Sequence, residues 1–226
     1  MDKKYWDGEN WLLVSKDDFE INYYLNDTLH RRNGPSLLNF NKEGKTIKKC
    51  YYINGLCHKE DGPAVIKYHN NGNNLIEYYY QNDKLHREDG PAFIDYFIDG
   101  INIFRELYYQ NDLLHRDYKP AEISYYKIGV TEKERYFQNG KRHRKNGPAE
   151  IWYYENNTIK KEKYFENDEL HRIDGPAIIE YNKNDVIESE KYFFNGKGFE
   201  LKNLSFDLPI DTEEKELYFN LKHFMS

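Results

Sequence analysis

Six copies of one short phrase hold most of the residues in this chain that could do chemistry. In its third copy the phrase reads His86-Arg87-Glu88-Asp89-Gly90-Pro91-Ala92. Histidine can bind metals or move protons near neutral pH, and arginine can grip phosphate or carboxylate groups with paired donors. The histidines are separated by 28, 28, 29, 28 and 28 residues, which predicts a repeat array. They are His30, His58, His86, His115, His143 and His171.

One hypothesis for the phrase is a recognition stripe. Its basic residue is an arginine in five copies and a lysine in the second. Beside many tyrosines, such a stripe could bind phosphates or stacked bases. The fourth copy has Tyr118-Lys119 in place of Asp-Gly yet keeps its His-Arg pair, which favours a role for the pair itself. The candidate binding residues are His58, Lys59, His86, Arg87, His115, Arg116, His143, Arg144, His171 and Arg172.

The other hypothesis is structural, and we favour it because every repeat must specify how it stacks on the next. Asp or Asn would cap a turn by bonding the backbone two residues on, Gly would supply a left-handed position, and Pro would start the next strand. His and Arg would bond carbonyls or glutamates of the next repeat. A glutamate stands nine residues before the histidine position in five repeats, which predicts an Arg–Glu ladder. These are Glu77, Glu106, Glu134, Glu162 and Glu190.

Metal binding and catalysis find little support in the sequence. One histidine per two-strand repeat implies a spacing of roughly 10 Å, too wide to share an ion whose nitrogen ligands lie at ~2.0 Å. Ser36, Cys50 and Cys57 stand in no nucleophile motif, and no glycine fingerprint for nucleotides is present. Cys57 takes a position that is leucine in other repeats, so it is expected to be a small buried apolar residue. We therefore predict no enzyme activity, no cofactor and no metal.

Two strands in each repeat are expected to position the phrase. Ala92, Ile94 and Tyr96 alternate along the first strand, a pattern typical of a half-buried β-strand. A turn follows, and the one extra residue of the third repeat falls there. The second strand ends in an aromatic pair such as Tyr79-Tyr80, and Asn82 then begins another tight turn. Tight connections join antiparallel strands, so the fold class is predicted to be all-β, an elongated antiparallel meander of about 28-residue β-hairpin repeats.

Three regions are expected along the chain. Residues 1–22 would form an N-terminal capping hairpin with two tryptophans as a lid, and residues 23–199 would form six to seven β-hairpin repeats. Residues 200–226 would form a C-terminal cap. Within it, Asp211 and Glu214 have the spacing of a helix capping box, and apolar residues follow at helical spacing. A short capping helix is therefore predicted at about 212–224.

Composition restricts the class of partner. The chain is only 38% hydrophobic and has a mean hydropathy of -1.00, but its 22 Tyr, 13 Phe and 3 Trp argue for an ordered protein. The net charge of -6 disfavours nonspecific nucleic-acid binding, which needs a basic surface. No apolar run is long enough for a transmembrane segment, and no secretory leader is visible. The expected location is cytoplasmic, meaning the host cytoplasm if the protein is viral.

The Tyr-x-x-Asn-Gly hairpin units resemble MORN-type β-hairpin repeats. The stretch from Asn82 to Ala92 is more closely similar to a repeat found in proteins of giant viruses, phages and bacteria. This resemblance covers about 23–199 and implies an elongated, MORN-like adaptor; some MORN proteins are proposed to bind lipids. The unit here is longer and lacks the dense glycine pattern of MORN repeats, so no binding residue is carried over.

These patterns lead to two functional hypotheses. The first is a non-enzymatic repeat scaffold that binds another macromolecule, most readily a protein. If the source is a virus or phage, it would be a host-directed interaction protein. The alternative is a sequestering protein that holds an anionic small molecule, such as a nucleotide immune signal, through its His-Arg stripe. Assembly into a homo-oligomer is compatible with both.

Overall fold

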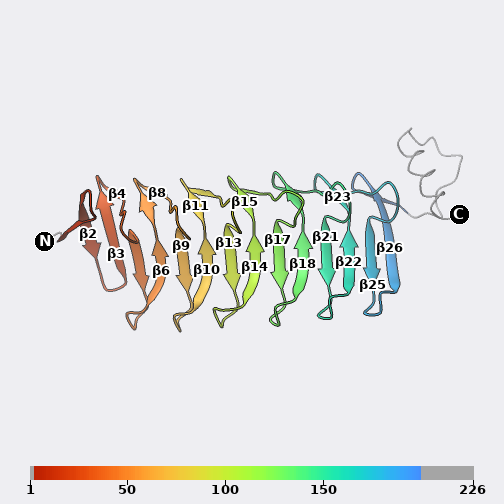
Figure 1. The fold of residues 1–226 in the computed structure, drawn as a ribbon, viewed down its shortest axis with the longest axis horizontal. Coiled ribbons are helices and arrows are strands. Elements are labelled where there is room, and N and C mark those ends of the chain that lie inside the picture. Colours follow the sequence, from red (N-terminus) through yellow and green to blue (C-terminus); the bar gives the residue numbers. More distant parts are fainter. Residues whose placement is uncertain (1–2, 200–226) are drawn as a thin grey trace, which may run out of the picture. The chain divides into compact units, whose positions relative to one another are not determined.

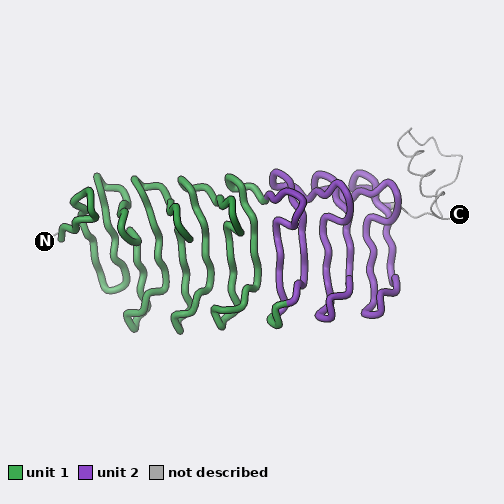
Figure 2. Tube along the Cα trace, in the orientation of Figure 1, with its two compact units in different colours: residues 1–114, 127–129 green, residues 115–126, 130–226 purple. Residues whose placement is uncertain are grey.

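The structure is a computed structural model, and it describes residues 3–199. Two compact units divide the chain: residues 1–114 with 127–129, and residues 115–126 with 130–226 (Figure 2). The predicted C-terminal cap at 200–226, including its helix at about 212–224, lies outside the described residues. Every helix or strand assigned within residues 3–199 is a strand, so the all-β prediction is confirmed there.

The first unit is a meander of antiparallel strands (Figure 1). Each long strand pairs with the next long strand along the chain. Short strands lie between them; the first pairs with the end of the long strand before it, and the others form small separate hairpins. The long strands are β1 (Lys3–Trp6), β2 (Trp11–Lys16), β3 (Glu20–Leu25), β5 (Leu37–Phe40), β6 (Thr46–Cys50), β9 (Val65–Tyr68), β10 (Asn74–Tyr78), β13 (Phe93–Tyr96) and β14 (Ile103–Leu107). The short strands are β4 (Thr28–Leu29), β7 (Tyr52–Ile53), β8 (Leu56–Cys57), β11 (Tyr80–Gln81), β12 (Lys84–Leu85), β15 (Tyr109–Gln110) and β16 (Leu113–Leu114).

The second unit repeats this arrangement. Its long strands again pair antiparallel with their neighbours in the chain. They are β17 (Glu122–Tyr125), β18 (Thr131–Arg135), β21 (Glu150–Tyr153), β22 (Ile159–Lys163), β25 (Ile178–Tyr181) and β26 (Ile187–Phe194), followed by β27 (Lys197–Phe199). The small hairpins are β19 (Phe137–Gln138) with β20 (Lys141–Arg142), and β23 (Phe165–Glu166) with β24 (Glu169–Leu170). The expected meander of β-hairpin repeats is therefore confirmed in both units.

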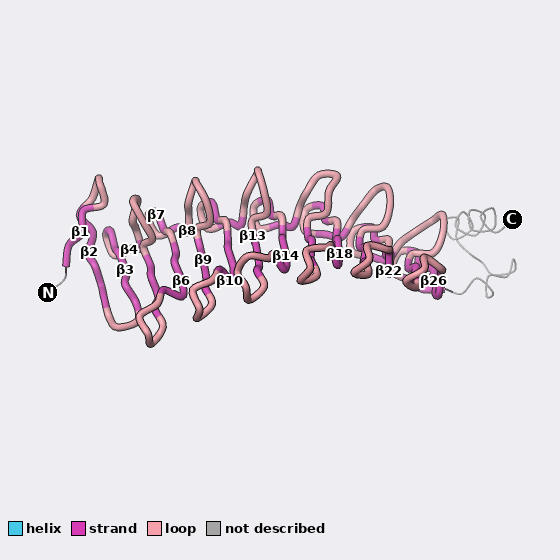
Figure 3. Tube along the Cα trace, turned by 60° about the horizontal axis from the view of Figure 1, so that its bottom comes forward, coloured by secondary structure: helices cyan, strands magenta, loops and turns pink. Residues whose placement is uncertain are grey.

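Each repeat has tight turns at opposite ends of its strands (Figure 3). In the turn after the first strand, a side-chain carboxylate or amide caps the backbone: Asp99 Oδ1 accepts hydrogen bonds from the N–H groups of Ile101 and Asn102, each 3.0 Å long. The turn in the small hairpin places Asn82 and Asp83 at φ 50° and 65°. Two successive positive φ values are the signature of a type I′ turn, as the Asn-Asp and Asn-Gly pairs predict.

The small hairpins of the first unit cover one face of the long strands. Cys50 of β6 and Val65 of β9 are buried in one cluster with Cys57 of the hairpin β7–β8 and with Ala64. Burial raises the pKa of both thiols, to about 12 at Cys57, so they behave as small apolar groups. Partly buried residues complete this cluster: Leu37, Tyr52, Tyr78 and Tyr80.

The second unit has charge at two of its three corresponding positions. Glu122 and Glu150 stand at the first position of β17 and β21, where β9 and β13 have Val65 and Phe93, and they are 6% and 2% exposed. Arg135 on β18 lies between them, with NH1 3.1 Å from Glu122 Oε2 and Nε 3.0 Å from Glu150 Oε2. The second unit therefore adds an ion-pair network to an interior that is otherwise apolar, since Ile178 at the first position of β25 and the nearby Phe165 are buried as well.

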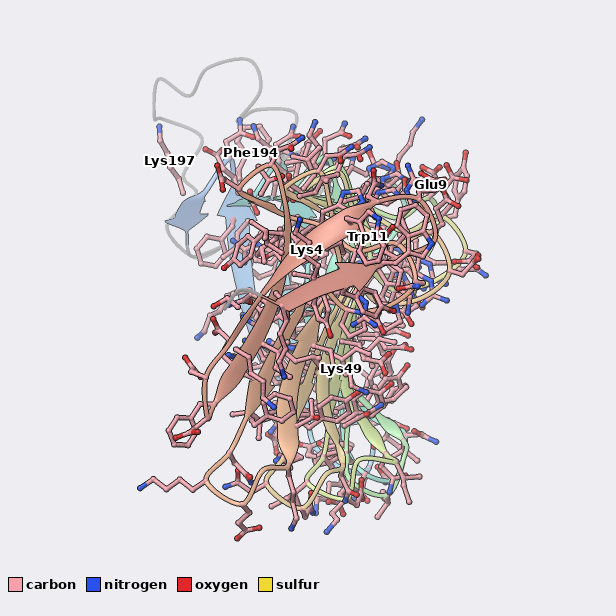
Figure 4. All side chains as sticks on the ribbon, turned by 90° about the vertical axis from the view of Figure 1, so that its left-hand side faces the viewer. Lys4, Glu9, Trp11, Lys49, Phe194 and Lys197 are labelled. Carbon is pink, nitrogen blue, oxygen red and sulfur yellow. The ribbon has the colours of Figure 1, made fainter. Side chains whose placement is uncertain are left out.

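A hairpin within residues 1–22 is present, formed by β1 and β2. The expectation that its tryptophans would act as a lid does not fit their exposure, since Trp6 and Trp11 are 47% and 64% exposed and pack on each other with ring centroids 5.5 Å apart. Trp11 is labelled in Figure 4. The apolar residue that the hairpin buries is Leu12, at 0% exposure. In an alternating strand the neighbours of a buried residue point the other way, so Trp11 faces outward because Leu12 faces inward.

Candidate functional site

The His-Arg phrase follows each small hairpin and leads into the next long strand, so its side chains lie where one repeat meets the next. Its histidine backbone N–H bonds the aromatic residue seven positions earlier, as His86 does to Tyr79 O at 3.1 Å. The basic residue donates its N–H to the next repeat, as Lys59 does to Tyr80 O at 3.3 Å. The backbone of the phrase is therefore hydrogen-bonded both to its own repeat and to the next one.

The histidine side chains also bond the next repeat. The Nδ1 atom accepts a hydrogen bond from the backbone N–H of the asparagine that opens the next small turn, at 3.0 Å for His30 and 3.3 Å for His58 and His86. The bond at His115 is 3.2 Å long. An accepting Nδ1 places the proton on Nε2. At His171, Nδ1 lies 2.8 Å from the Asn195 side-chain oxygen as well as 3.3 Å from its N–H.

His143 departs from this pattern, because its buried Nδ1 has no hydrogen-bond partner among the described residues. The Nε2 atoms of four other phrase histidines lie near carboxylates: 3.5 Å from Asp7 for His30, 3.9 Å from Glu88 for His86, 3.4 Å from Asp117 for His115 and 3.5 Å from Glu166 for His171.

The phrase arginines fold back over a tyrosine of their own repeat, as seen for Arg31, Arg87, Arg144 and Arg172. The guanidinium of Arg87 lies 4.0 Å from the Tyr79 ring centroid, donates from NH1 to Pro91 O at 3.4 Å, and donates from Nε to Asp89 at 2.8 Å. Arg31, Arg144 and Arg172 also stack on a tyrosine and bond the proline carbonyl four residues on, and Arg116 makes the same carbonyl bond. These cations are therefore held by the repeat itself.

The expected positive φ of the phrase glycine is found in only two copies: Gly62 and Gly147 have φ values of 116° and 119°, whereas Gly34, Gly90 and Gly175 do not have a positive φ. A Cβ on Gly90 would lie 2.8 Å from Arg87 Cζ, so glycine makes room for the guanidinium there. No ion pair to a glutamate of the predicted Arg–Glu ladder forms at Arg87, Arg144 or Arg172, so the ladder is not formed at these three residues. The arginines bond carbonyls, as the hypothesis allowed, and the glutamates bond tyrosines: Tyr153 OH donates to Glu134 at 3.1 Å.

The structure brings phrases of successive repeats together around shallow grooves. One groove of about 540 Å³ lies between the first two phrases, and its basic lining residues are Arg31, Arg32, His58 and Lys59. The acidic residues Glu60 and Asp61 line it as well. Another, of about 370 Å³, lies between the fifth and sixth phrases and is lined by His143, Arg144, His171 and Arg172. Six of the ten candidate residues thus line these two grooves, and neither groove includes His86, Arg87, His115 or Arg116.

Sequence reasoning missed the buried carboxylates of the second unit. Glu150 accepts hydrogen bonds from Trp152 Nε1 at 2.7 Å and pairs with Lys163 Nζ at 3.1 Å. A signal for this network was present, because Glu122 and Glu150 interrupt an apolar position while Arg135 and Lys163 occupy the facing strand. Opposite charges directly across two strands favour each other.

Within residues 3–199, no three His, Cys, Asp or Glu residues gather in a way that could hold a metal ion. The part of the chain that the structure describes has no helix of the length and apolarity needed to cross a bilayer. No protein-family model matches the chain, and no curated protein sequence matches it.

Replacing Arg87 with alanine is expected to lower the free energy of unfolding by about 2 kcal/mol, because a charged hydrogen bond and a cation–π contact are lost together. The loss should be the same in phosphate, chloride and nucleotide-containing buffers. Urea unfolding measures it, with Lys84→Ala, an exposed residue of the preceding hairpin, as the matched control. An unchanged stability with loss of a ligand-induced shift would support the recognition stripe instead.

Proposed function

We propose that this chain is a non-enzymatic repeat scaffold that binds a protein partner through an exposed apolar turn. The observation that carries the proposal is the turn between β13 and β14 in the first unit. Ile98 and Ile101 are 69% and 80% exposed there, and Phe104 on β14 is 37% exposed. Ile128, in the segment 127–129 that belongs to the same compact unit, is 68% exposed. Apolar residues grouped on a surface are typical of interaction sites.

The fold does not need apolar residues in this turn. The equivalent turns of other repeats are polar: Lys42-Glu43-Gly44, Asn70-Asn71-Gly72, Glu155-Asn156-Asn157 and Lys183-Asn184-Asp185. These turns are made by the same kind of side-chain cap, for example from Asn71 Oδ1 to the Asn73 N–H at 3.0 Å. The isoleucines of the turn between β13 and β14 therefore add exposed apolar surface that the fold does not require.

The bonding of the phrase supports a scaffold over the sequestering alternative. A stripe that grips an anion needs donors that are free, and the phrase arginines already donate to proline carbonyls of their own repeats. The net charge of -6 also favours a protein over a nucleic acid as the macromolecular partner.

The test compares proteins retained by immobilised variants from a lysate of the cells in which the chain is made. The double variant Ile98→Ser/Ile101→Ser should lose at least one protein that the natural chain retains, by about tenfold (~1.4 kcal/mol). Its stability should not change, because both side chains are exposed. The matched control is Val186→Ser/Ile187→Ser, which alters another exposed apolar pair beside a turn, at 57% and 50% exposure. Identical sets of retained proteins for all three chains would refute the proposal.

A further inference from the structure

A group of four residues recurs on one face of the sheet, and we call it the quartet. In the fifth repeat it comprises Glu134, Tyr136, Arg144 and Tyr153. The Glu134 carboxylate accepts hydrogen bonds from the Tyr136 hydroxyl at 3.5 Å and from the Tyr153 hydroxyl at 3.1 Å. The Arg144 guanidinium lies 3.9 Å from the Tyr136 ring centroid. The carboxylate therefore fills a position lined by two hydroxyl donors and a cation.

The third repeat builds the same quartet in the first unit from Glu77, Tyr79, Arg87 and Tyr96. The Tyr79 hydroxyl donates to Glu77 at 3.4 Å, and Arg87 lies 4.0 Å from the Tyr79 ring centroid. Burial raises the pKa of Tyr96, and its hydrogen bond to Glu77 raises it further. The sixth repeat has the bond from Tyr181 to Glu162 at 3.0 Å, together with Arg172 over Tyr164.

The second repeat lacks the carboxylate of the quartet. Lys49 takes the position of the glutamate, since it pairs with Ile66 across β6 and β9 as Glu77 pairs with Ile94 across β10 and β13. Lys59 takes the position of the phrase arginine and lies over the Tyr51 ring, with Nζ 4.1 Å from its centroid. Lys49 Nζ lies 5.2 Å from the ring centroid of Tyr68 (Figure 4 labels Lys49).

The donors of this altered quartet have no acceptor among the described residues. The hydroxyls of Tyr51 and Tyr68 form no hydrogen bond there, and Lys49 and Lys59 form no ion pair. All four side chains are half-buried. Burial lowers the pKa of Lys59, and the charge of Lys49 lowers it further against the opposing pull of Asp61 and Glu77. Two ammonium groups thus stack on the tyrosines of this repeat, where the quartets of the third, fifth and sixth repeats hold a glutamate, and the charge of Lys49 acts unfavourably on Lys59.

We propose that Lys49, Tyr51, Lys59 and Tyr68 form a binding site for an external oxyanion of the carboxylate or phosphate class. Such an anion would take the place that the glutamate carboxylate has in the other repeats. Tyr51 and Lys59 also line the groove of about 540 Å³ between the first two phrases, which gives a ligand access from solvent. Charge-assisted hydrogen bonds from ammonium and hydroxyl donors suit both ligand types. This site is independent of the apolar turn proposed for protein binding.

The test is a titration of the natural chain and of Lys49→Glu with inorganic phosphate and, separately, with acetate, both at constant ionic strength made up with chloride. The natural chain should show a saturable rise in its thermal unfolding midpoint with at least one of the two anions. Lys49→Glu restores the carboxylate, so it should unfold at a higher temperature without added anion and should not respond to either. Lys42→Glu is the matched control: it makes the same charge change at an exposed turn residue of the same repeat and should keep the response.

An NMR titration with inorganic phosphate keeps the proposal testable if a variant folds poorly. Ring signals of Tyr51 and Tyr68 should shift and saturate, whereas those of Tyr136 and Tyr153, whose quartet holds Glu134, should not. A response that persists in Lys49→Glu, equal shifts at both pairs of tyrosines, or no response to either anion would each overturn the proposal. The expected fold-change is a loss of at least tenfold in anion affinity for Lys49→Glu.

Discussion

Replacing Glu150 with glutamine is expected to lower the free energy of unfolding by about 3–5 kcal/mol, the usual effect of removing one partner from a buried ion pair. The Glu150 side chain is only 2% exposed and bonds Arg135, Lys163 and Trp152. Glutamine keeps the shape but removes the charge, so the two cations would stay in the interior with weaker partners. The loss arises mainly from those uncompensated charges.

The effect of Glu150→Gln should depend on pH. Burial would raise the pKa of Glu150, but the hydrogen bond from Trp152 and the interactions with Lys163 and Arg135 outweigh it, so the pKa is lowered. A carboxyl group with a lowered folded-state pKa contributes stability above its unfolded pKa and loses that contribution as pH falls through the folded pKa. The difference between the natural chain and Glu150→Gln should therefore be fully present at neutral pH and shrink below the ordinary glutamate value of 4.5.

Urea unfolding followed by tryptophan fluorescence measures this prediction, because Trp152 is the only tryptophan between residues 115 and 226. Repeat arrays need not unfold in a single step, so a local probe is preferable to a global one. Glu155→Gln, at an exposed turn of the same unit, is the control and should change the free energy by less than about 0.5 kcal/mol. Equal effects of the two substitutions would show that the network contributes no more than a surface charge.

Replacing Leu12 with alanine is expected to cost about 2–5 kcal/mol, as large-to-small changes in a core do. Leu12 is fully buried in β2 and is the largest fully buried side chain among the described residues. The N-terminal hairpin has few other apolar residues directed inward, so the cavity would loosen its contact with β3. The exposed pair of Trp6 and Trp11 lies on this hairpin and reports on it.

The neighbouring residue provides the control for Leu12. Leu13 is 42% exposed and has the same side chain in the same strand, so Leu13→Ala should cost less than about 1 kcal/mol. Tryptophan fluorescence in urea should show early loss of the hairpin signal for Leu12→Ala, which can be separated from Trp152 in a Trp152→Phe background. Similar losses for the two variants would mean that the hairpin is not anchored by its buried leucine.

Strands and turns were predictable because they depend on residues close together in the sequence. Ala92, Ile94 and Tyr96 alternate within one strand, and Asn82 with Asp83 defines a type I′ turn by local backbone preference alone. The nearly constant spacing of the six phrases then repeats each local inference and leaves only an antiparallel meander. The order of strand pairing followed from the short connections.

Side-chain partners were harder to predict because they lie in different repeats. The bond from the Asn54 N–H to His30 Nδ1 spans 24 residues, and nothing in the phrase indicates that an imidazole accepts there. The sequence showed that the glutamates recur once per repeat, but it offered both Arg87 and Tyr79 as partners for Glu77. Only the folded structure shows that Tyr79 donates the hydrogen bond. That Arg87 stacks on the tyrosine depends on the space left by Gly90, which composition cannot reveal.

The bonds of the phrase reach one repeat ahead and no farther, as those from His30 to Asn54 and from His58 to Asn82 show. A duplication or loss of one 28-residue segment within a unit would therefore recreate the same junction from the same parts. The one extra residue between phrases lies near the turn around Asp99, away from the phrase, and this turn still accepts a bond from the preceding one, from Asn73 Nδ2 to Asp99 O at 2.8 Å. The number of repeats can thus change in a single recombination step. A single copy can also diverge while its neighbours keep the chain folded, as the second has done with Lys49 and Lys59.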